Sequence, residues 1–152
     1  MPKHHKELQD KLLLEMFDLI EQSVLAKTNV ETSANNGYLL LAKTRYTNGS
    51  QCVATSKLPT EDSNEFSALS TVSRSSSDEV GRASQLELVQ QPVDRDEGFV
   101  DPLKWFGVLI PNSLQLARDR FNKSLDYVIE SANIQLRLHQ VLCNLIRLKS
   151  LN

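Results

Sequence analysis

Apolar residues recur at helical spacing near the start of the chain. Between His5 and Lys27 they follow a period of about 3.6 residues. The apolar positions are Leu8, Leu12, Leu13, Met16, Phe17, Ile20 and Val24. Charged and amide side chains such as Lys11, Glu15 and Asp18 occupy the opposite side. This pattern predicts an amphipathic helix with a broad apolar stripe.

The next residues weaken the helical pattern and then restore it. Residues 28–36, TNVETSANN, combine β-branched and turn-forming types, which predicts a kink or a break, with a continuous helix as the alternative. Residues 37–46, GYLLLAKTRY, favour a second short helical piece. Asn48 and Gly49 suit a left-handed cap after it. We therefore expect residues 4–48 to form an N-terminal helical arm.

Residues 49–98 differ in character from the arm. They contain ten serines and three threonines, and nine acidic side chains against four basic ones. Their hydrophobic residues are isolated, so the segment is expected to bury too little apolar surface to offset the entropy of ordering. The composition predicts a disordered acidic Ser-rich linker.

Two short stretches of this linker resemble targets of basophilic kinases. Arg74 precedes Ser75–Ser77, and Arg82 stands two residues before Ser84. A phosphate there would add negative charge and strong hydrogen-bond acceptors. A passive tether is the alternative, and the sequence leaves the choice open.

A short aromatic helical turn is expected within residues 99–111. Asp101 followed by Pro102 is the pairing of a capping carboxylate with a first helical position that needs no amide donor. The turn should run from Leu103 to Phe106. Gly107 can end it, and Pro111 forces a change of direction.

Residues 112–151 are expected to form one long C-terminal helix. Ser113 to Ser150 contain no proline or glycine, and at 1.5 Å per residue the helix would be roughly 55 Å long. Its apolar stripe comprises Leu114, Ala117, Phe121, Leu125, Val128, Ala132, Leu136, Leu142, Leu145 and Leu148. Antiparallel pairing with the N-terminal arm would cover both stripes. The expected fold class is all-α, an antiparallel helical hairpin or coiled coil with a long disordered Ser-rich insertion.

Several kinds of chemistry find little support in the sequence. Residues 112–152 carry a net charge of +3, six basic against three acidic side chains, but lack the interleaved aromatics that stack on bases, so no nucleic-acid partner is expected. His4 and His5 are adjacent and make a poor metal site. His139 and Cys143 lack an orienting third group. There is no phosphate loop or nucleophile elbow. We expect a protein that is not an enzyme, with no catalytic, metal or cofactor-binding residue.

Any association with a membrane is expected to be peripheral or through a partner. The longest uncharged stretch, Trp105 to Ala117, is too short to span a bilayer and contains Pro111. The apolar positions at the start of the chain are interrupted by charges, so no signal-peptide core is predicted.

The stretch Trp105 to Ile110 is a dense apolar block with the single tryptophan. Trp105 and Phe106 bury a large area and tolerate exposure badly. They are expected to pack onto the hairpin, to fill a groove on a partner, or to do both.

Two segments carry a family resemblance. They are DPLKWFGVLIPNSLQLARDRF, residues 101–121, and GYLLLAKTRYTNG, residues 37–49. Together they resemble the coiled-coil subunit of the endoplasmic-reticulum assembly complex for the vacuolar ATPase. The sequence departs from that family at Lys104, where arginine is frequent, and at Asn48, where a hydrophobic residue is often seen. These departures affect charge-dependent contacts more than the fold.

The resemblance implies a non-enzymatic assembly factor for the membrane sector of the vacuolar ATPase. It implies a membrane-embedded assembly factor and ATPase subunits as partners, at the cytosolic face of the endoplasmic reticulum, with endosomes, lysosomes or Golgi-intermediate vesicles as alternative locations. The apolar stripe alone would equally suit a generic coiled-coil adaptor or homodimeric scaffold. The candidate partner-binding residues are Asp101, Pro102, Leu103, Trp105, Phe106, Gly107, Pro111 and Phe121.

Overall fold

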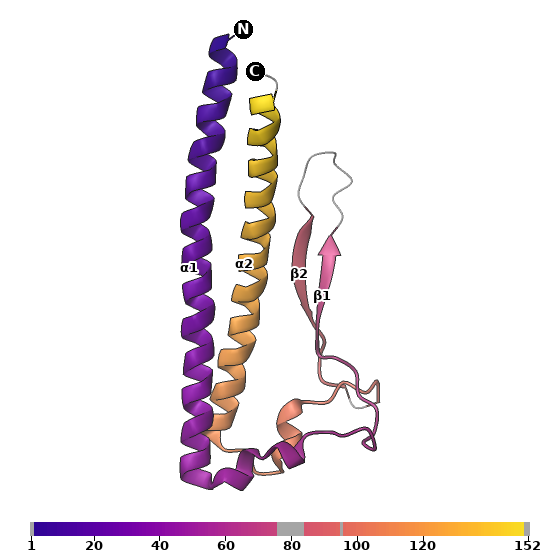
Figure 1. The fold of residues 1–152 in the computed structure, drawn as a ribbon. Helices are drawn as coiled ribbons and strands as arrows, with labels where there is room; N and C mark the ends of the chain where they lie inside the picture. The colour runs from indigo at the N-terminus through magenta and orange to yellow at the C-terminus, as the bar shows by residue number, and fades with distance from the viewer. Residues whose placement is uncertain (1, 76–83, 95, 151–152) are drawn as a thin grey trace.

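Two long helices lie side by side and run in opposite directions. The computed structural model describes residues 2–75, 84–94 and 96–150, with side chains from residue 5 onward. Helix α1 spans Pro2–Asn48 and α2 spans Asn112–Ser150. The chain ends lie together at one end of the pair, and the connecting segments gather at the other, which we call the closed end (Figure 1).

Helix α1 runs without interruption through residues 28–36, so the predicted kink or break is wrong. The hydroxyl of Thr28 donates to the Val24 carbonyl at 3.0 Å. The buried hydroxyl of Ser33 donates to the Arg120 carbonyl of α2 at 2.9 Å. Unfavourable helix propensities amount to a few tenths of a kcal/mol per residue, about 0.7 at most. Packing against α2 outweighs them.

Small and hydroxyl side chains fill much of the seam between the helices. Thr44 is fully buried; its Oγ1 donates to the Leu40 carbonyl at 2.8 Å and lies 2.7 Å from Ser113 Oγ. Small side chains allow close approach of two helix backbones. The buried seam residues are Leu19, Ser23, Ala26, Ser33, Gly37 and Thr44 of α1, and Leu114, Ala117, Ser124, Ser131 and Val141 of α2.

The two helices pair antiparallel, but the predicted coiled coil is wrong. Leu125 and Leu142 of the α2 stripe remain exposed, while Ser124 and Ser131 are buried against α1. Leu114 and Ala117 of the predicted stripe are buried, so the seam combines large apolar side chains with small and hydroxyl ones.

Gly37 and Phe121 fit closely together in the seam. A Cβ atom on Gly37 would lie 2.9 Å from both Cε1 and Cζ of Phe121. The same ring meets Tyr38 edge to face, with centroids 5.2 Å apart. Further along, Arg137 Nη2 lies 2.8 Å from Glu15 Oε1, an exposed ion pair consistent with the same antiparallel register.

A pair of strands also corrects the predicted fold class. Strand β1, Ser70–Ser75, pairs antiparallel with β2, Gln85–Gln90, and two 3-10 turns, η1 at Ser50–Val53 and η2 at Thr55–Lys57, precede them. The all-α class with a disordered insertion is therefore wrong. A signal for β2 was present in the alternation of Leu86, Glu87 and Leu88, which are half-buried, exposed and half-buried in turn.

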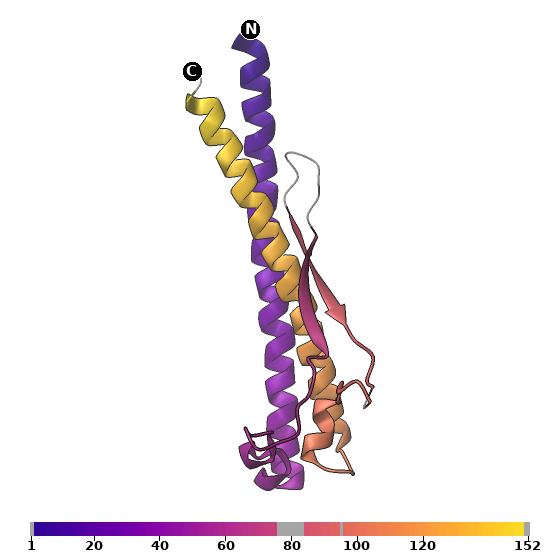
Figure 2. The same cartoon turned by 90° about the vertical axis from the view of Figure 1, so that its right-hand side faces the viewer.

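Asn133 of α2 holds the strand pair against the helices. Its Oδ1 accepts from the Leu86 N–H at 2.8 Å, and its Nδ2 donates to the Leu86 carbonyl at 2.9 Å. The side-chain amide thus satisfies backbone groups on the outer edge of β2, as a neighbouring strand would. Strand β2 accordingly lies nearer to α2 than β1 does (Figures 1 and 2).

Replacing Gly37 by Val should destabilise the hairpin by driving a side chain into the Phe121 ring. We expect the free energy of unfolding to fall by about 1–3 kcal/mol, as measured by chemical denaturation. Asn36→Val is the matched control, because it places the same β-branched residue at an exposed position of α1. Adding Phe121→Ala to Gly37→Val should recover part of the loss. An equal loss of unfolding free energy in Gly37→Val and Asn36→Val would refute the contact between Gly37 and Phe121.

Candidate partner-binding surfaces

The segment before α2 forms the 3-10 turn η3, Pro102–Phe106, at the closed end. Asp101 caps it as predicted, since its Oδ1 accepts from the Leu103 N–H at 3.0 Å. Its other oxygen lies 3.2 Å from Arg118 Nη1 of α2. Gly107 ends the turn at a φ of +131°, a backbone angle that a side chain would strain.

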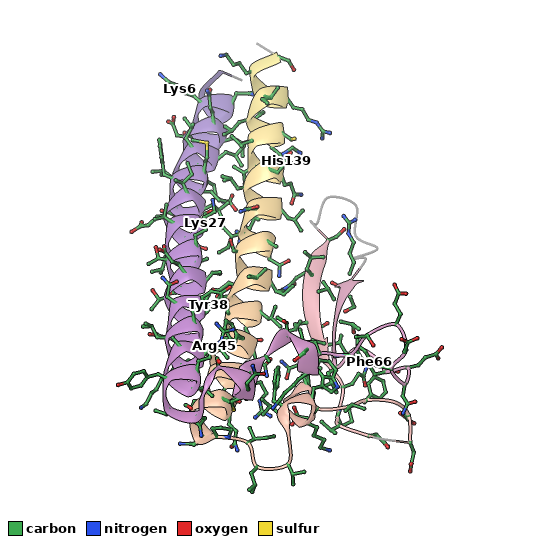
Figure 3. All side chains as sticks on the ribbon, turned by 60° about the horizontal axis from the view of Figure 1, so that its bottom comes forward. Lys6, Lys27, Tyr38, Arg45, Phe66 and His139 are labelled. Carbon is green, nitrogen blue, oxygen red and sulfur yellow. The ribbon has the colours of Figure 1, made fainter. Side chains whose placement is uncertain are left out.

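The aromatic residues of this segment are partly covered by other parts of the chain. Leu103 is buried, and Trp105 and Phe106 are half-buried. The Trp105 ring meets Phe66 edge to face with centroids 5.2 Å apart, and Lys57 Nζ donates to the Phe106 carbonyl at 3.1 Å. Phe66 lies in the loop region away from α1 (Figure 3). Sequence reasoning missed Phe66, because an isolated aromatic in a Ser-rich stretch has no periodicity to mark it.

The two aliphatic residues after Gly107 face outward instead. Val108 is 98% exposed and Leu109 is 94% exposed. We call residues 107–110 the tip loop. The apolar block of the sequence is thus divided at Gly107, with half-buried aromatic residues before it and the exposed Val108 and Leu109 after it. Gly107 and Pro111 predicted a turn, but the sequence did not show which side chains of the turn would be exposed.

The other candidate residues have different positions. Pro102, Gly107 and Pro111 shape the backbone around η3, whereas Phe121 lies further along α2, in the seam against Gly37. The structure therefore brings Asp101 to Pro111 together at the closed end and separates Phe121 from them. Their role in partner binding stays a prediction.

A second apolar surface runs along α1 on the side away from α2. It consists of four side chains that are 60–67% exposed, which we call the outer stripe: Leu14, Phe17, Val24 and Leu25. At 100° per residue these positions fall within about a third of the helix circumference, opposite Leu19 and Ala26. Phe17 and Val24 were part of the stripe predicted to pair with α2. In the structure they lie on the opposite, exposed side of α1.

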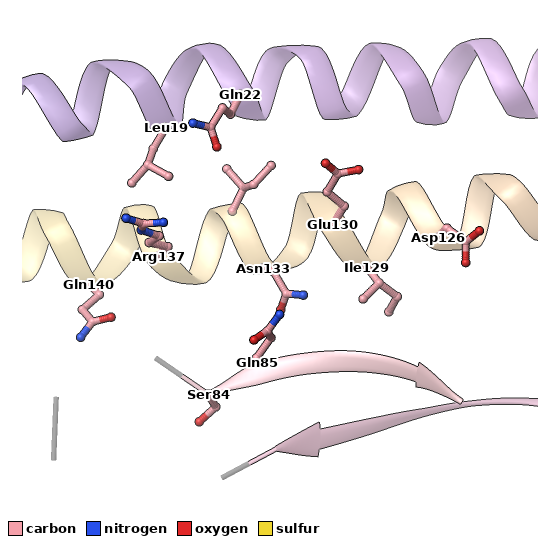
Figure 4. A pocket seen from close by; sticks show the side chains of 11 residues that line it. Leu19, Gln22, Ser84, Gln85, Asp126, Ile129, Glu130, Asn133, Arg137 and Gln140 are labelled. Atoms are coloured by element: carbon pink, nitrogen blue, oxygen red, sulfur yellow. The ribbon is translucent and has the colours of Figure 1, made fainter. Parts of the chain in front are cut away.

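A cleft of about 760 Å³ lies between the helices and the start of β2 (Figure 4). Its walls carry charges of both signs, including Asp126, Glu130 and Arg137. Among the residues that the structure describes, no group of three or more His, Cys, Asp or Glu side chains is placed to hold a metal ion. Ser84 lies at this cleft. Its phosphorylation stays a prediction, and Ser76 and Ser77 are outside the described residues.

His139 and Cys143 approach each other one turn apart on α2. Cys143 Sγ lies 3.6 Å from His139 Nε2, and the histidine is exposed. Burial and an orienting partner, which activate a catalytic cysteine–histidine pair, are not provided by this surface contact. Within residues 2–75, 84–94 and 96–150, no helix is both long and apolar enough to cross a membrane.

The fold and its surfaces define a helical hairpin with a docked strand pair and two uncovered apolar surfaces, the outer stripe and the tip loop. No protein-family model matches the chain. Three curated proteins are similar to the chain, and each is named Vacuolar ATPase assembly protein VMA22. The human protein is 28% identical over 148 residues, covering 85% of this chain and 82% of its own length.

The other two relatives give the same result. The mouse protein is 27% identical, with 88% of this chain and 84% of its own length covered, and the bovine protein is 26% identical, with 85% and 82% covered. These matches confirm the resemblance to the vacuolar ATPase assembly factor family that residues 37–49 and 101–121 indicated.

Truncating Trp105 should cost stability, whereas truncating the tip loop should not. Trp105→Ala removes the ring that packs on Phe66, and we expect the free energy of unfolding to fall by about 1–3 kcal/mol, less than for a fully buried aromatic. The double variant Val108→Ser/Leu109→Ser should change it by less than about 0.5 kcal/mol. Thermal and chemical denaturation would measure both. A tip-loop variant as unstable as Trp105→Ala would show that these aliphatic residues pack inside.

Proposed function

We propose that this chain is a non-enzymatic assembly factor for the vacuolar proton-transporting ATPase. The observation that carries the proposal is the similarity to three proteins of that name across at least 85% of this chain. The match extends over both helices and the segment between them, so it is not confined to one short motif. The role proposed is binding, without a cofactor.

The finer proposal concerns place and partner. We infer that the protein acts on the membrane sector of the ATPase at the cytosolic face of the endoplasmic reticulum, together with a membrane-embedded assembly factor. The family resemblance of the sequence supports this location. The outer stripe supports a stable protein partner, since several large apolar side chains exposed on one face of a helix mark an interaction surface.

The outer stripe has enough apolar surface to contribute to binding. Burying four large side chains that are about 60% exposed would contribute on the order of 5 kcal/mol. Ordering and association entropy offset part of this gain. A helix lying along α1 would cover the stripe with its own apolar residues.

Charges beside the stripe indicate which helix would fit. Asp10 and Glu21 lie on the same face of α1 as Leu14 and Phe17, and both are exposed. A partner helix with basic residues flanking its apolar stripe would complement them. A second copy of α1 would bring these carboxylates against each other or against apolar residues, which favours a heterologous partner over a homodimeric scaffold.

The residues at the closed end then have an indirect part in assembly. Asp101, Trp105 and Phe106 hold η3 against α2 and the Phe66 loop, so they fix the shape of the hairpin from which the outer stripe is presented. We propose that their substitution weakens partner binding through loss of stability.

Replacing Phe17 and Val24 by Ser should remove the partner contact while leaving the hairpin folded. We expect the double variant to keep its helix content, to lose co-purification with the ATPase membrane sector and its assembly factors from solubilised membranes, and to fail to support vacuolar acidification. Leu142→Ser/Ile146→Ser is the matched control, because it removes two exposed aliphatic residues from α2.

Retention of both co-purification and acidification by Phe17→Ser/Val24→Ser would refute the outer stripe as the binding surface. The mass of the purified chain in solution tests the adaptor alternative. A monomer is expected, and a stable homodimer lost on substitution of the stripe would favour a homodimeric scaffold.

A further inference from the structure

The strand pair has one edge held against α2 and one open edge. Asn133 bonds the N–H and the carbonyl of Leu86, so α2 closes the outer edge of β2 at that residue. Strand β1 lies on the side of the pair away from α2 (Figure 1), and all six of its residues are exposed. A two-stranded pair has low stability by itself in water, but here a side chain of a long helix holds it in place. The outer edge of β1 is therefore an open edge on a supported strand.

The strand register shows which backbone groups of β1 point outward. The Gln91 N–H donates to the carbonyl of Leu69 at 2.8 Å, one position before the paired residues. Hydrogen-bonded and non-hydrogen-bonded pairs alternate along an antiparallel ladder, so every second residue of β1 after Leu69 bonds to β2. The residues between them, which direct their N–H and carbonyl groups to the outer edge, are Ser70, Val72 and Arg74. Leu86, opposite Arg74, fits the same alternation, since its own groups point outward to Asn133.

The outward groups of β1 have no hydrogen-bond partner among the residues that the structure describes. Many proteins protect an exposed strand edge with proline, lysine or a bulge. Strand β1, STVSRS, contains neither proline nor lysine, and its pairing with β2 is regular along its whole length. A regular edge with open backbone groups is a surface to which an extended peptide adds as a further strand.

The side chains of β1 indicate what kind of strand would fit. Directly opposite residues share a face of the sheet, so Val72 lies beside the half-buried Leu88. Val72 is 57% exposed, and an apolar residue opposite it on a third strand would cover its free side. Arg74 follows two residues later on the same face and is exposed. A carboxylate opposite Arg74 would form a cross-strand charge pair.

We propose that the outer edge of β1 binds an extended segment of a partner protein as a third, antiparallel strand. The segment has an apolar residue opposite Val72 and an acidic residue opposite Arg74, two positions apart. A second copy of the chain fits less well, because β1 contains no acidic residue to pair with Arg74. The inference goes beyond the proposed assembly role, since it adds a surface for a strand to the outer stripe, which suits a helix.

Binding of a synthetic strand to the purified full chain tests this inference. The probe is a capped seven-residue peptide of threonines with valine at its centre and glutamate two residues before it, because threonine and valine favour extended backbone. We expect saturable binding in isothermal titration calorimetry. In hydrogen exchange followed by NMR, the peptide should slow the amides of Ser70, Val72 and Arg74. It should leave those of Thr71 and Ser73 unchanged, because they already bond to β2.

Val72→Pro removes an outward N–H and keeps the ladder to β2. We expect it to weaken peptide binding by about tenfold, the loss of one hydrogen bond together with close approach of the strand, with an unchanged melting temperature. Val72→Thr is the matched control, because it keeps the N–H and should weaken binding less. Arg74→Glu should weaken binding by up to about fivefold and should favour a peptide with lysine in place of glutamate.

Methylation of single peptide nitrogens tests the backbone pairing directly. The N–H of the peptide's valine would donate to the Val72 carbonyl, so N-methylation of this valine should abolish binding. The N–H of the threonine beside it points away from β1, and its N-methylation should preserve binding.

The outer-stripe variant separates this inference from the assembly role. Phe17→Ser/Val24→Ser should bind the peptide like the unsubstituted chain, so the two proposals fail independently. The inference is overturned if no saturable binding occurs up to about 1 mM peptide, if Val72→Pro binds as well as Val72→Thr, or if the two N-methylated peptides bind equally. A dimer of the full chain that is lost in Val72→Pro would also overturn it, because a second copy would then occupy the edge.

Discussion

Close contact between small and hydroxyl side chains of α1 and α2 is the constraint on which the rest of the structure depends. Thr44, Ser33 and Gly37 lie in the seam, where larger residues would push the helices apart. Hydrogen bonds from Thr44 and Ser33 satisfy their buried hydroxyls, which would otherwise be costly. The seam thereby mixes these residues with a few large aliphatic ones such as Leu19 and Leu114, and other large apolar residues remain on the outside of the molecule.

The exposed apolar surfaces of the molecule follow from this seam. Because α2 packs on the face of α1 that holds Leu19 and Ala26, Phe17 and its neighbours in the outer stripe are directed away from it. Because the seam continues to Thr44 and Ser113, η3 is held at the closed end and the tip loop projects from it. The outer stripe and the tip loop are therefore two separate exposed apolar surfaces of one hairpin.

Sequence patterns predicted the features that depend on residues close together in the chain. Apolar periodicity indicated helix on both sides of the middle segment, and the order Asp101, Pro102 and Gly107 predicted the capped turn now seen as η3. The strand pair was missed because β1 is exposed along its whole length, so no alternation of burial marks it. Continuity through Ser33 and the outward direction of Val108 depend on contacts with distant residues, which a sequence pattern does not contain.

Hydrogen exchange of the α1 amides tests the central claim most directly. If packing against α2 holds α1 together, residues 28–36 should exchange as slowly as the helical segments before and after them, despite their poor helix propensity. Ser33→Ala should accelerate exchange mainly in that stretch, because it removes the hydrogen bond to Arg120. Exchange of residues 28–36 at the rate of an unstructured peptide in the unsubstituted chain would contradict the account.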